Sequence, residues 1–268
     1  MCSASLKRLL VFAALLACHG ATARELKVCA DPNNLPFSNA LQQGFENRIV
    51  DIVAKDLGAT VHYTWWAQRR GFIGHALDRG LCDLVPGIAA VDGVLLTYPP
   101  YYRSAYVFVT RSGEPPIASF DDPRLKTLEV GVQLVGEEGA NTPPAMALAR
   151  RGITQNVHGY LVSGDYRQAN PPSRIITALA MGEIDVALAW GPMAGFFAKQ
   201  QTVPLTVTPV VRQFEPGPLP MAFDVAMGLR LDEGDLLQDV EGALARRKGE
   251  VDAVLAQYNV PRLDGAKP

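Results

Sequence analysis

Ala76-Leu-Asp-Arg-Gly-Leu-Cys-Asp83 and Ala178-Leu-Ala-Met-Gly-Glu-Ile-Asp185 share one pattern. In each segment an amphipathic helical pattern ends at a glycine and leads, close to an aspartate, into a short apolar run typical of a buried strand. Helices that alternate with such strands are typical of a mainly parallel sheet covered by helices. The sequence therefore predicts an α/β protein in which this unit occurs twice.

The rest of the chain extends the same alternation. Apolar residues recur at helical spacing from Phe45 to Leu57, and Gly58 follows as a stop signal. Helical patterns also occur at 72–77 and 175–180, and the stretch 235–258 has enough apolar positions for two helices. The expected strands are 26–30, 60–64, 81–85, 105–110, 127–132, 184–189, 205–211 and 223–229.

The length of 268 residues suits one large domain or two small ones. Segments rich in proline and glycine at 113–116 and 215–218 are the expected boundaries between two lobes. The middle of the chain would then form one lobe, while the beginning and end share the other. We expect a first lobe of residues 24–108 and 212–268, a second lobe of residues 109–211, and a leader of residues 1–23.

The leader has the features of a secretory signal. Lys7 and Arg8 precede the apolar run Leu9–Ala17, and Ala21-Thr-Ala23 provides a cleavage site. The run is much shorter than the ~20 residues that span a bilayer, so the mature chain is predicted to have no transmembrane segment. Leu15-Leu-Ala-Cys18 also resembles a lipobox, which leaves lipid anchoring at Cys18 as the alternative. We expect cleavage after Ala23 and export to the periplasm.

Composition and cysteine count narrow the class of protein. A chain with 48% hydrophobic and 19% charged residues folds, and a net charge of −2 offers no field for nucleic acid. Only Cys29 and Cys82 follow the leader, so one disulfide is predicted in an oxidising compartment, with two separate buried thiols as the alternative. The three histidines that follow the leader are isolated along the chain and predict no metal site.

An ordered set of short motifs resembles the type II periplasmic solute-binding proteins. Besides the two opening segments, it comprises Asp31-Pro-Asn-Asn-Leu-Pro-Phe37, Gly44-Phe-Glu46, Thr97-Tyr-Pro-Pro-Tyr101 and Gly131-Val-Gln133. The resemblance covers nearly all of residues 26–258. It implies two α/β lobes joined by two crossover strands, expected at 105–110 and 207–211, with a cleft between the lobes.

Within that group the chain is more similar to the MxaJ/XoxJ-like branch associated with quinoprotein alcohol dehydrogenases. The similarity is carried by Val28-Cys-Ala-Asp-Pro-Asn-Asn-Leu-Pro-Phe-Ser38, Trp66-Ala-Gln-Arg-Arg-Gly-Phe72 and Pro100-Tyr-Tyr-Arg-Ser104. It implies a noncatalytic periplasmic accessory, without a cofactor of its own, that supports a pyrroloquinoline quinone-dependent methanol or alcohol dehydrogenase. The resemblance does not specify what the accessory does for the enzyme.

Two other functions compete with this one. Amino-acid receptors of this fold carry an arginine before the Thr-x-x-Pro-Tyr element, where it clamps the ligand carboxylate, but residues 87–96 contain neither arginine nor lysine. The alternative is therefore an ABC importer component for a small solute that is not an amino acid. Cyclohexadienyl dehydratases share the fold, yet the empty clamp and the absence of G-x-S-x-G, H-E-x-x-H, P-loop and G-x-G-x-x-G motifs argue against an enzyme.

Candidate site residues follow from strand ends and from the branch motifs. Side chains at the ends of strands in α/β proteins face the ligand crevice, and the expected cleft residues are Asp31, Asn34, Trp66, Tyr101, Gln133, Glu137 and Trp190. For Asp31 and Asn34 turn formation is an alternative role, and for Glu137 a place near a helix N-terminus. Because aromatic and arginine side chains dominate interface energy, a partner surface is expected at Arg69, Arg70, Tyr102 and Arg103, next to Trp66 and Tyr101. The alternative is that the tyrosines are packed inside and the arginines are only solvated.

Overall fold

The structure is a computed structural model that describes residues 24–69, 71–89, 93–136, 141–216 and 219–263. The predicted leader with Cys18, together with Arg70 and Glu137, lies outside the described residues. Within the described ranges, no helix combines the length and the apolar character needed to cross a bilayer.

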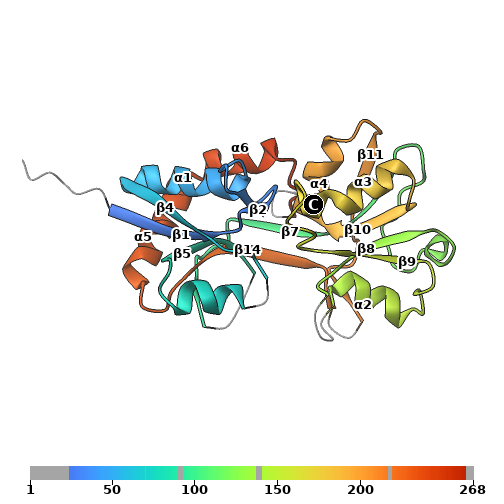
Figure 1. Cartoon of the computed structure of the whole chain (residues 1–268), viewed down its shortest axis with the longest axis horizontal. Helices are drawn as coiled ribbons and strands as arrows, with labels where there is room; N and C mark the ends of the chain where they lie inside the picture. The colour runs from blue at the N-terminus through green and yellow to red at the C-terminus, as the bar shows by residue number, and fades with distance from the viewer. Residues whose placement is uncertain (1–23, 70, 90–92, 137–140, 217–218, 264–268) are drawn as a thin grey trace, which may run out of the picture.

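The first lobe is formed by both ends of the chain. Strand β1 lies in parallel between β4 and β5, and α1 packs against β4, α5 and α6 (Figure 1). Its core includes Val28, Ile49 and Leu255. The elements are β1 (Arg24–Ala30), β2 (Asn33–Asn34), β3 (Ser38–Asn39), α1 (Phe45–Leu57), β4 (Ala59–Trp65), a π-helical turn (Gly74–Asp78), β5 (Leu84–Ile88), β6 (Leu95–Leu96), α5 (Gly234–Arg246) and α6 (Lys248–Gln257).

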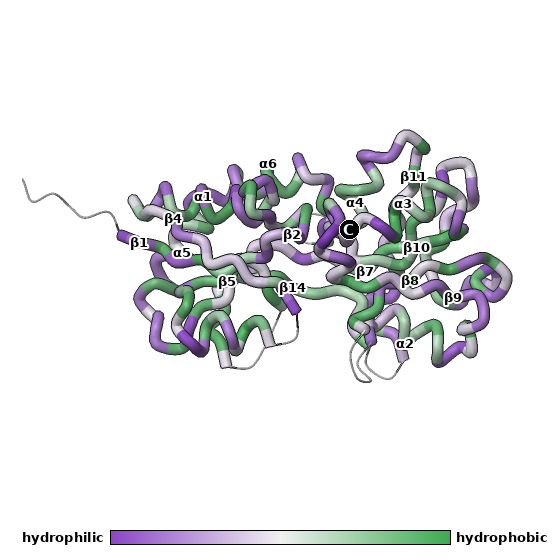
Figure 2. The backbone as a smooth tube through the Cα atoms, in the orientation of Figure 1, coloured by the Kyte–Doolittle hydropathy of each residue, from purple (hydrophilic) through white to green (hydrophobic). Residues whose placement is uncertain are grey.

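The second lobe is formed by the middle of the chain. Strand β8 lies in parallel between β9 and β10, with α2 on one face of the sheet and α3 and α4 on the other (Figure 1). Figure 2 shows that strand β10 is mostly hydrophobic, as expected for a strand covered on both faces. The elements are 3₁₀ turns at Pro123–Lys126 and Pro171–Ser173, β8 (Val130–Leu134), α2 (Pro143–Arg150), β9 (Val157–Leu161), α3 (Arg174–Met181), β10 (Val186–Trp190), α4 (Gly191–Lys199), β11 (Leu205–Pro209), β12 (Phe214–Glu215) and β13 (Leu219–Pro220).

Two strands connect the lobes. Strand β7 (Tyr102–Arg111) begins in the first core, at Tyr102, and continues into the second lobe, where it pairs with β10 and β11. Strand β14 (Ala222–Leu229) pairs first with β7 and then with β5 and β6. The expected crossover at 105–110 therefore lies within β7, whereas the one at 207–211 is wrong, because β11 pairs with β7 inside the second lobe and Val210 belongs to its core.

Local sequence explains most of these elements. The buried residues of α1 include Phe45, Ile49, Val50 and Val53, one face of a helix, and Gly58 ends it at a φ of 62°. The segment predicted as a helix at 72–77 is helical, but from Gly74 to Asp78 it is a π-helical turn, while α3 and the two C-terminal helices match their predictions. Strand β9 was not predicted, because its burial does not follow a clear alternation.

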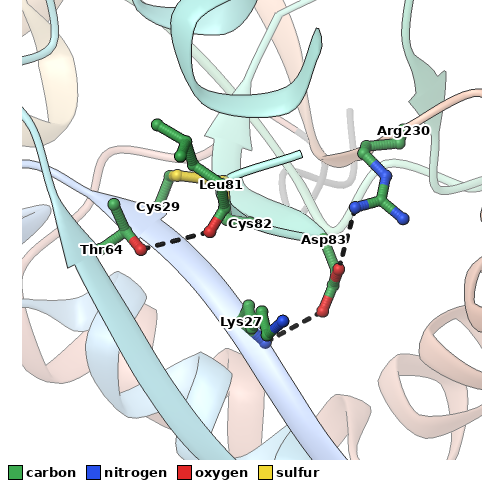
Figure 3. The surroundings of a disulfide bond; sticks show 7 residues. All are labelled: Lys27, Cys29, Thr64, Leu81, Cys82, Asp83 and Arg230. Atoms are coloured by element: carbon green, nitrogen blue, oxygen red, sulfur yellow. Dashed lines mark hydrogen bonds and ion pairs between the residues drawn. A yellow bond between two sulfur atoms is a disulfide. The ribbon is translucent and has the colours of Figure 1, made fainter. Parts of the chain in front are cut away.

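The predicted disulfide is present. Cys29 on β1 and Cys82 just before β5 are bonded, with a Cα–Cα distance of 5.6 Å, and both are fully buried (Figure 3). The residues flanking Cys82 are tied to their neighbours: Thr64 Oγ1 donates to the Leu81 carbonyl at 3.3 Å, and the Asp83 carboxylate accepts from the Lys27 amide at 3.2 Å. The disulfide therefore reinforces the junction between the π-helical turn and β5.

Candidate functional site

A cavity of about 430 Å³ lies between the two lobes and is lined in part by the two strands that connect them. This position agrees with the general rule that α/β proteins bind ligands beyond the carboxyl ends of their strands. The first lobe contributes Asp31, Asn34, Phe37, Glu46, Gln68, Gly87 and Ala89, the connecting strands Tyr102, Tyr106, Phe223 and Val225, and the second lobe Gln133, Val162, Ser163, Tyr166 and Trp190.

Asp31, directly after β1, is buried, and its carboxylate accepts three hydrogen bonds. Its Oδ1 accepts from the Asn33 amide at 2.8 Å, and its Oδ2 accepts from the Gln68 amide at 2.6 Å and from the Tyr166 hydroxyl. The first bond is the Asx-turn contact of the structural alternative, and the last reaches the second lobe. Asp31 therefore shapes the turn and also lines the cavity.

Contacts between the lobes surround this hydrogen bond. The Asn33 side-chain amide donates to the Gln168 carbonyl at 3.0 Å, and the Arg69 guanidinium lies 4.9 Å from the Tyr166 ring centre. We call Asp31, Asn33, Arg69, Tyr166 and Gln168 the latch. Burial, reinforced by donation to Asp31, raises the pKa of Tyr166 above its usual value, so the hydroxyl stays protonated and keeps donating across the cleft.

Glu46 is the second acid of the cavity and has a different environment. It lies in the first turn of α1 and is 6% exposed. Burial, with a smaller contribution from the charge of Asp31, raises the pKa of Glu46 to about 8. Gly87 permits the close approach, since a Cβ there would lie 2.0 Å from Glu46 Oε1.

Three aromatic rings that line the cavity pack against one another. Trp190 lies edge-to-face with Tyr106 at 5.4 Å and with Phe223 at 5.8 Å, and the Tyr106 and Phe223 rings are 6.3 Å apart. We call Tyr106, Trp190 and Phe223 the aromatic cluster. The Trp190 backbone amide donates to Gln133 Oε1 at 2.8 Å, which fixes the strand end that carries the ring.

The cavity has no basic side chain among its described lining residues. The segment 87–96, where amino-acid receptors carry their arginine, contributes Gly87 and Ala89 to the lining. The described lining therefore provides no guanidinium that would clamp a carboxylate. Within the described ranges, no cluster of histidine, cysteine or acidic residues is arranged to hold a metal ion.

The structure brings together four of the expected cleft residues, namely Asp31, Asn34, Gln133 and Trp190. Trp66 lies off the cavity, 46% exposed, with its ring 3.8 Å from that of His75. Tyr101 is buried in the first core, and its hydroxyl donates to the Pro86 carbonyl at 3.0 Å. Neither residue is among the described residues that line the cavity.

The expected partner surface is only partly at the surface. Arg69 is exposed, and Arg103 is partly buried in an ion pair with Asp224 at 2.9 Å. Tyr102 is 1% exposed and faces the cavity, so its assignment to the surface is wrong. The alternative that the tyrosines are packed inside describes Tyr101 and Tyr102 correctly.

Glu46, Tyr106, Tyr166 and Phe223 were not recognised as site residues from the sequence. A signal for Glu46 was available, because it shares a helix face with Ile49, Val50 and Val53, and an acid on a buried face needs an explanation. The aromatic residues carry no such signal, since rings in apolar strands usually belong to the core.

Comparison with known proteins places this fold and cavity in context. No family model matches the chain. It is 33% identical over 251 residues to Protein MoxJ of Methylorubrum extorquens, covering 89% of this chain and 81% of that protein. The crystal structure of the periplasmic binding protein XoxJ from Methylobacterium extorquens AM1 is 39% identical with a TM-score of 0.72, covering 90% of this chain and all of that one. MxaJ from Methlophaga aminisulfidivorans MPT is 25% identical with a TM-score of 0.75, covering 89% of this chain and all of that one.

Proposed function

The chain belongs to the family of MoxJ, MxaJ and XoxJ, and from this premise we propose that it is a noncatalytic periplasmic accessory of a quinoprotein dehydrogenase. The partner would be a pyrroloquinoline quinone-dependent methanol or alcohol dehydrogenase, which the protein binds or supports. The observation that carries the proposal is the similarity to MoxJ and XoxJ over nearly the whole described chain. The described cavity lining, which has no base to clamp a carboxylate, argues against an amino-acid receptor.

The proposed contact surface centres on the segment that follows β4. Trp66 and Arg69 are both exposed there, and Arg70 belongs to the same segment. Arg103 is a weaker candidate because its guanidinium is already bonded to Asp224 and to Gln213 Oε1. Exposed tryptophan and arginine side chains are the types that contribute most to interface affinity.

Binding to the purified dehydrogenase tests this proposal. We expect a complex by surface plasmon resonance, and Trp66→Ala or Arg69→Ala to weaken it by about fivefold or more, which corresponds to roughly 1 kcal/mol. Tyr98→Ala and Arg48→Ala are matched controls: Tyr98 is an exposed aromatic residue, and Arg48 is an exposed arginine lying 5.6 Å from the ring centre of Tyr258. Absence of a complex with any quinoprotein would refute the accessory role, and full binding by both variants would refute this surface.

A second function is favoured by the cavity itself. A cavity lined by residues of both lobes suits a receptor of an ABC importer for a small solute that is not an amino acid. Capture of a permease rather than a dehydrogenase by the purified protein would favour this alternative.

The lobe boundaries are part of the same proposal. We propose a first lobe of residues 24–108 and 212–268 and a second lobe of residues 109–211. Leu219 and Met221 pack in the core of the second lobe, which favours moving its end from 211 to about 221. Limited proteolysis that cuts first near 113–116 and 221 would support the revised boundary, whereas a first cut between 211 and 216 would support the original one.

A further inference from the structure

The cavity combines acidic and aromatic side chains without a base among its described residues. Asp31 and Glu46 carry its carboxyl groups, and the aromatic cluster lines it together with Phe37 and Tyr102. Such a lining disfavours anions and offers nothing to neutralise a carboxylate. Ring faces and carboxylates both attract cations.

The two carboxyl groups of the cavity differ in how they are used. Asp31 accepts three hydrogen bonds from the protein. The Glu46 carboxyl has no hydrogen bond or ion pair to any described residue, although it is more than nine-tenths buried. A buried polar group without a partner is costly, which indicates that its partner is something the cavity receives.

The aromatic cluster supplies the complementary part of a binding site. Its three rings are locked edge-to-face, so they present fixed ring faces and edges to the cavity. Aromatic rings and a carboxylate in one cavity can together recognise an alkylated ammonium group, because its methyl groups contact the rings while its charge is neutralised.

We propose that the cavity between the lobes binds a small organic cation without a carboxylate, of the alkylammonium class. Its ammonium group faces Glu46, and its alkyl groups contact Trp190, Tyr106 and Phe223. The latch, which joins the two lobes through Asp31–Tyr166 and Asn33–Gln168, holds them together around such a ligand. This inference goes beyond the accessory role and does not depend on it.

Protonation of Glu46 should be linked to binding. The titratable groups that face it are Asp31, Tyr63, Tyr101 and Tyr102, and no described base is among them. Because the pKa of Glu46 is raised to about 8, the empty site holds a mostly protonated carboxyl at pH 7. A bound cation favours the carboxylate, so affinity should rise from pH 6 to about pH 8 and then level off, with proton release on binding.

Calorimetry of the purified protein with choline and with its neutral isostere 3,3-dimethylbutan-1-ol tests the proposal. The two probes have the same shape and differ in charge. We expect choline to bind at least tenfold more tightly than the alcohol, and glycine betaine to bind more weakly than choline because its carboxylate meets Asp31. Equal affinity for choline and the alcohol, or no heat from choline at 10 mM, would overturn the proposal.

Glu46→Gln keeps the shape of the side chain and removes its charge. It should reduce choline affinity at least tenfold, leave the alcohol unchanged and abolish the pH dependence. Glu250→Gln on α6, an exposed acid away from the cavity, is the matched control and should bind choline as the unmodified protein does. If Glu46→Gln fails to fold, Phe223→Leu provides the second test, with choline losing more affinity than the alcohol.

Unchanged choline binding by a folded Glu46→Gln protein would also overturn the proposal. The dehydrogenase complex is measured separately with different variants. Failure of choline binding therefore leaves the accessory role standing, and failure of the complex leaves the cation site standing.

Discussion

Each lobe has an aspartate at the junction between a helical segment and the strand that follows it. In the first lobe the Asp83 carboxylate accepts from the Lys27 amide at 3.2 Å, and in the second the Asp185 carboxylate accepts from the Glu129 amide at 3.0 Å. An arginine from a connecting strand or just beyond it meets each carboxylate: Arg230 at 3.3 Å and Arg111 at 3.0 Å.

The lobes secure this junction by different means. In the second lobe Arg111 also donates to the carbonyls of Leu179 and Ile184, which holds the end of α3 against β10. In the first lobe Arg230 instead bonds the carboxylates of Asp232 and Glu233, and the short helical segment ends in a π-helical turn. We infer that the disulfide in the first lobe takes the role that the hydrogen bonds from Arg111 to Leu179 and Ile184 have in the second lobe. One sequence pattern can thus be stabilised by a covalent bond or by a charged side chain.

Removal of the disulfide should have the largest effect on this comparison. Cys82→Ala should lower the free energy of unfolding by about 2–5 kcal/mol, because the unfolded chain regains a loop of 53 residues. Urea unfolding of the variant and of the native protein under oxidising conditions measures the difference. A loss below about 1 kcal/mol would show that the other contacts around Asp83 suffice.

The lobes also differ in the charge that they present to the cavity. The first lobe buries Glu46, whereas the second contributes the uncharged residues Gln133, Tyr166 and Trp190. The pKa of Glu46 is raised when the protein folds, so ionisation opposes folding: the penalty is absent below about pH 4.5 and grows as the pH rises toward 8.

Glu46→Gln removes this penalty. It should therefore stabilise the protein by roughly 3 kcal/mol at pH 7 and by almost nothing at pH 4. Thermal unfolding of both proteins from pH 4 to pH 8 measures the trend. A stability difference that does not grow with pH would mean that the carboxyl is paired in solution.

The aspartates themselves should give a smaller difference. Asp185→Ala should cost about 1.5–3 kcal/mol, since it removes hydrogen bonds to a charged group, while Asp83→Ala should cost less because the disulfide still holds its junction. Urea unfolding compares the two variants. After reduction of the disulfide, Asp83→Ala should cost more than before, because the two constraints act on one junction. Equal losses of stability for Asp185→Ala, for Asp83→Ala and for Asp83→Ala after reduction would show that the aspartate and the disulfide stabilise the protein independently.

Local patterns predicted the elements well, since burial on one face of a helix or strand leaves a periodic trace in the chain. The helix Phe45–Leu57, its end at Gly58 and the strands β1, β4, β8 and β10 follow from such traces, whereas the strand expected at 81–85 begins three residues later, as β5. The disulfide was also predictable, because only two cysteines lie beyond the predicted leader. The order of strands was not: an apolar run such as 205–211 has the same pattern whether it connects two lobes or pairs inside one.

The residues of the site also divide into those that local sequence predicts and those that depend on tertiary packing. Asp31, Asn34, Gln133 and Trp190 could be selected by their place at or next to a strand end. The pairing of Tyr106 with Phe223 and the isolation of Glu46 depend on how β7, β14 and α1 meet in space. Hydrophobic periodicity records which face of an element is dry, but it carries no information about the element that covers that face. Partners distant in the chain, and the cavity between them, arise only when long-range packing brings those faces together.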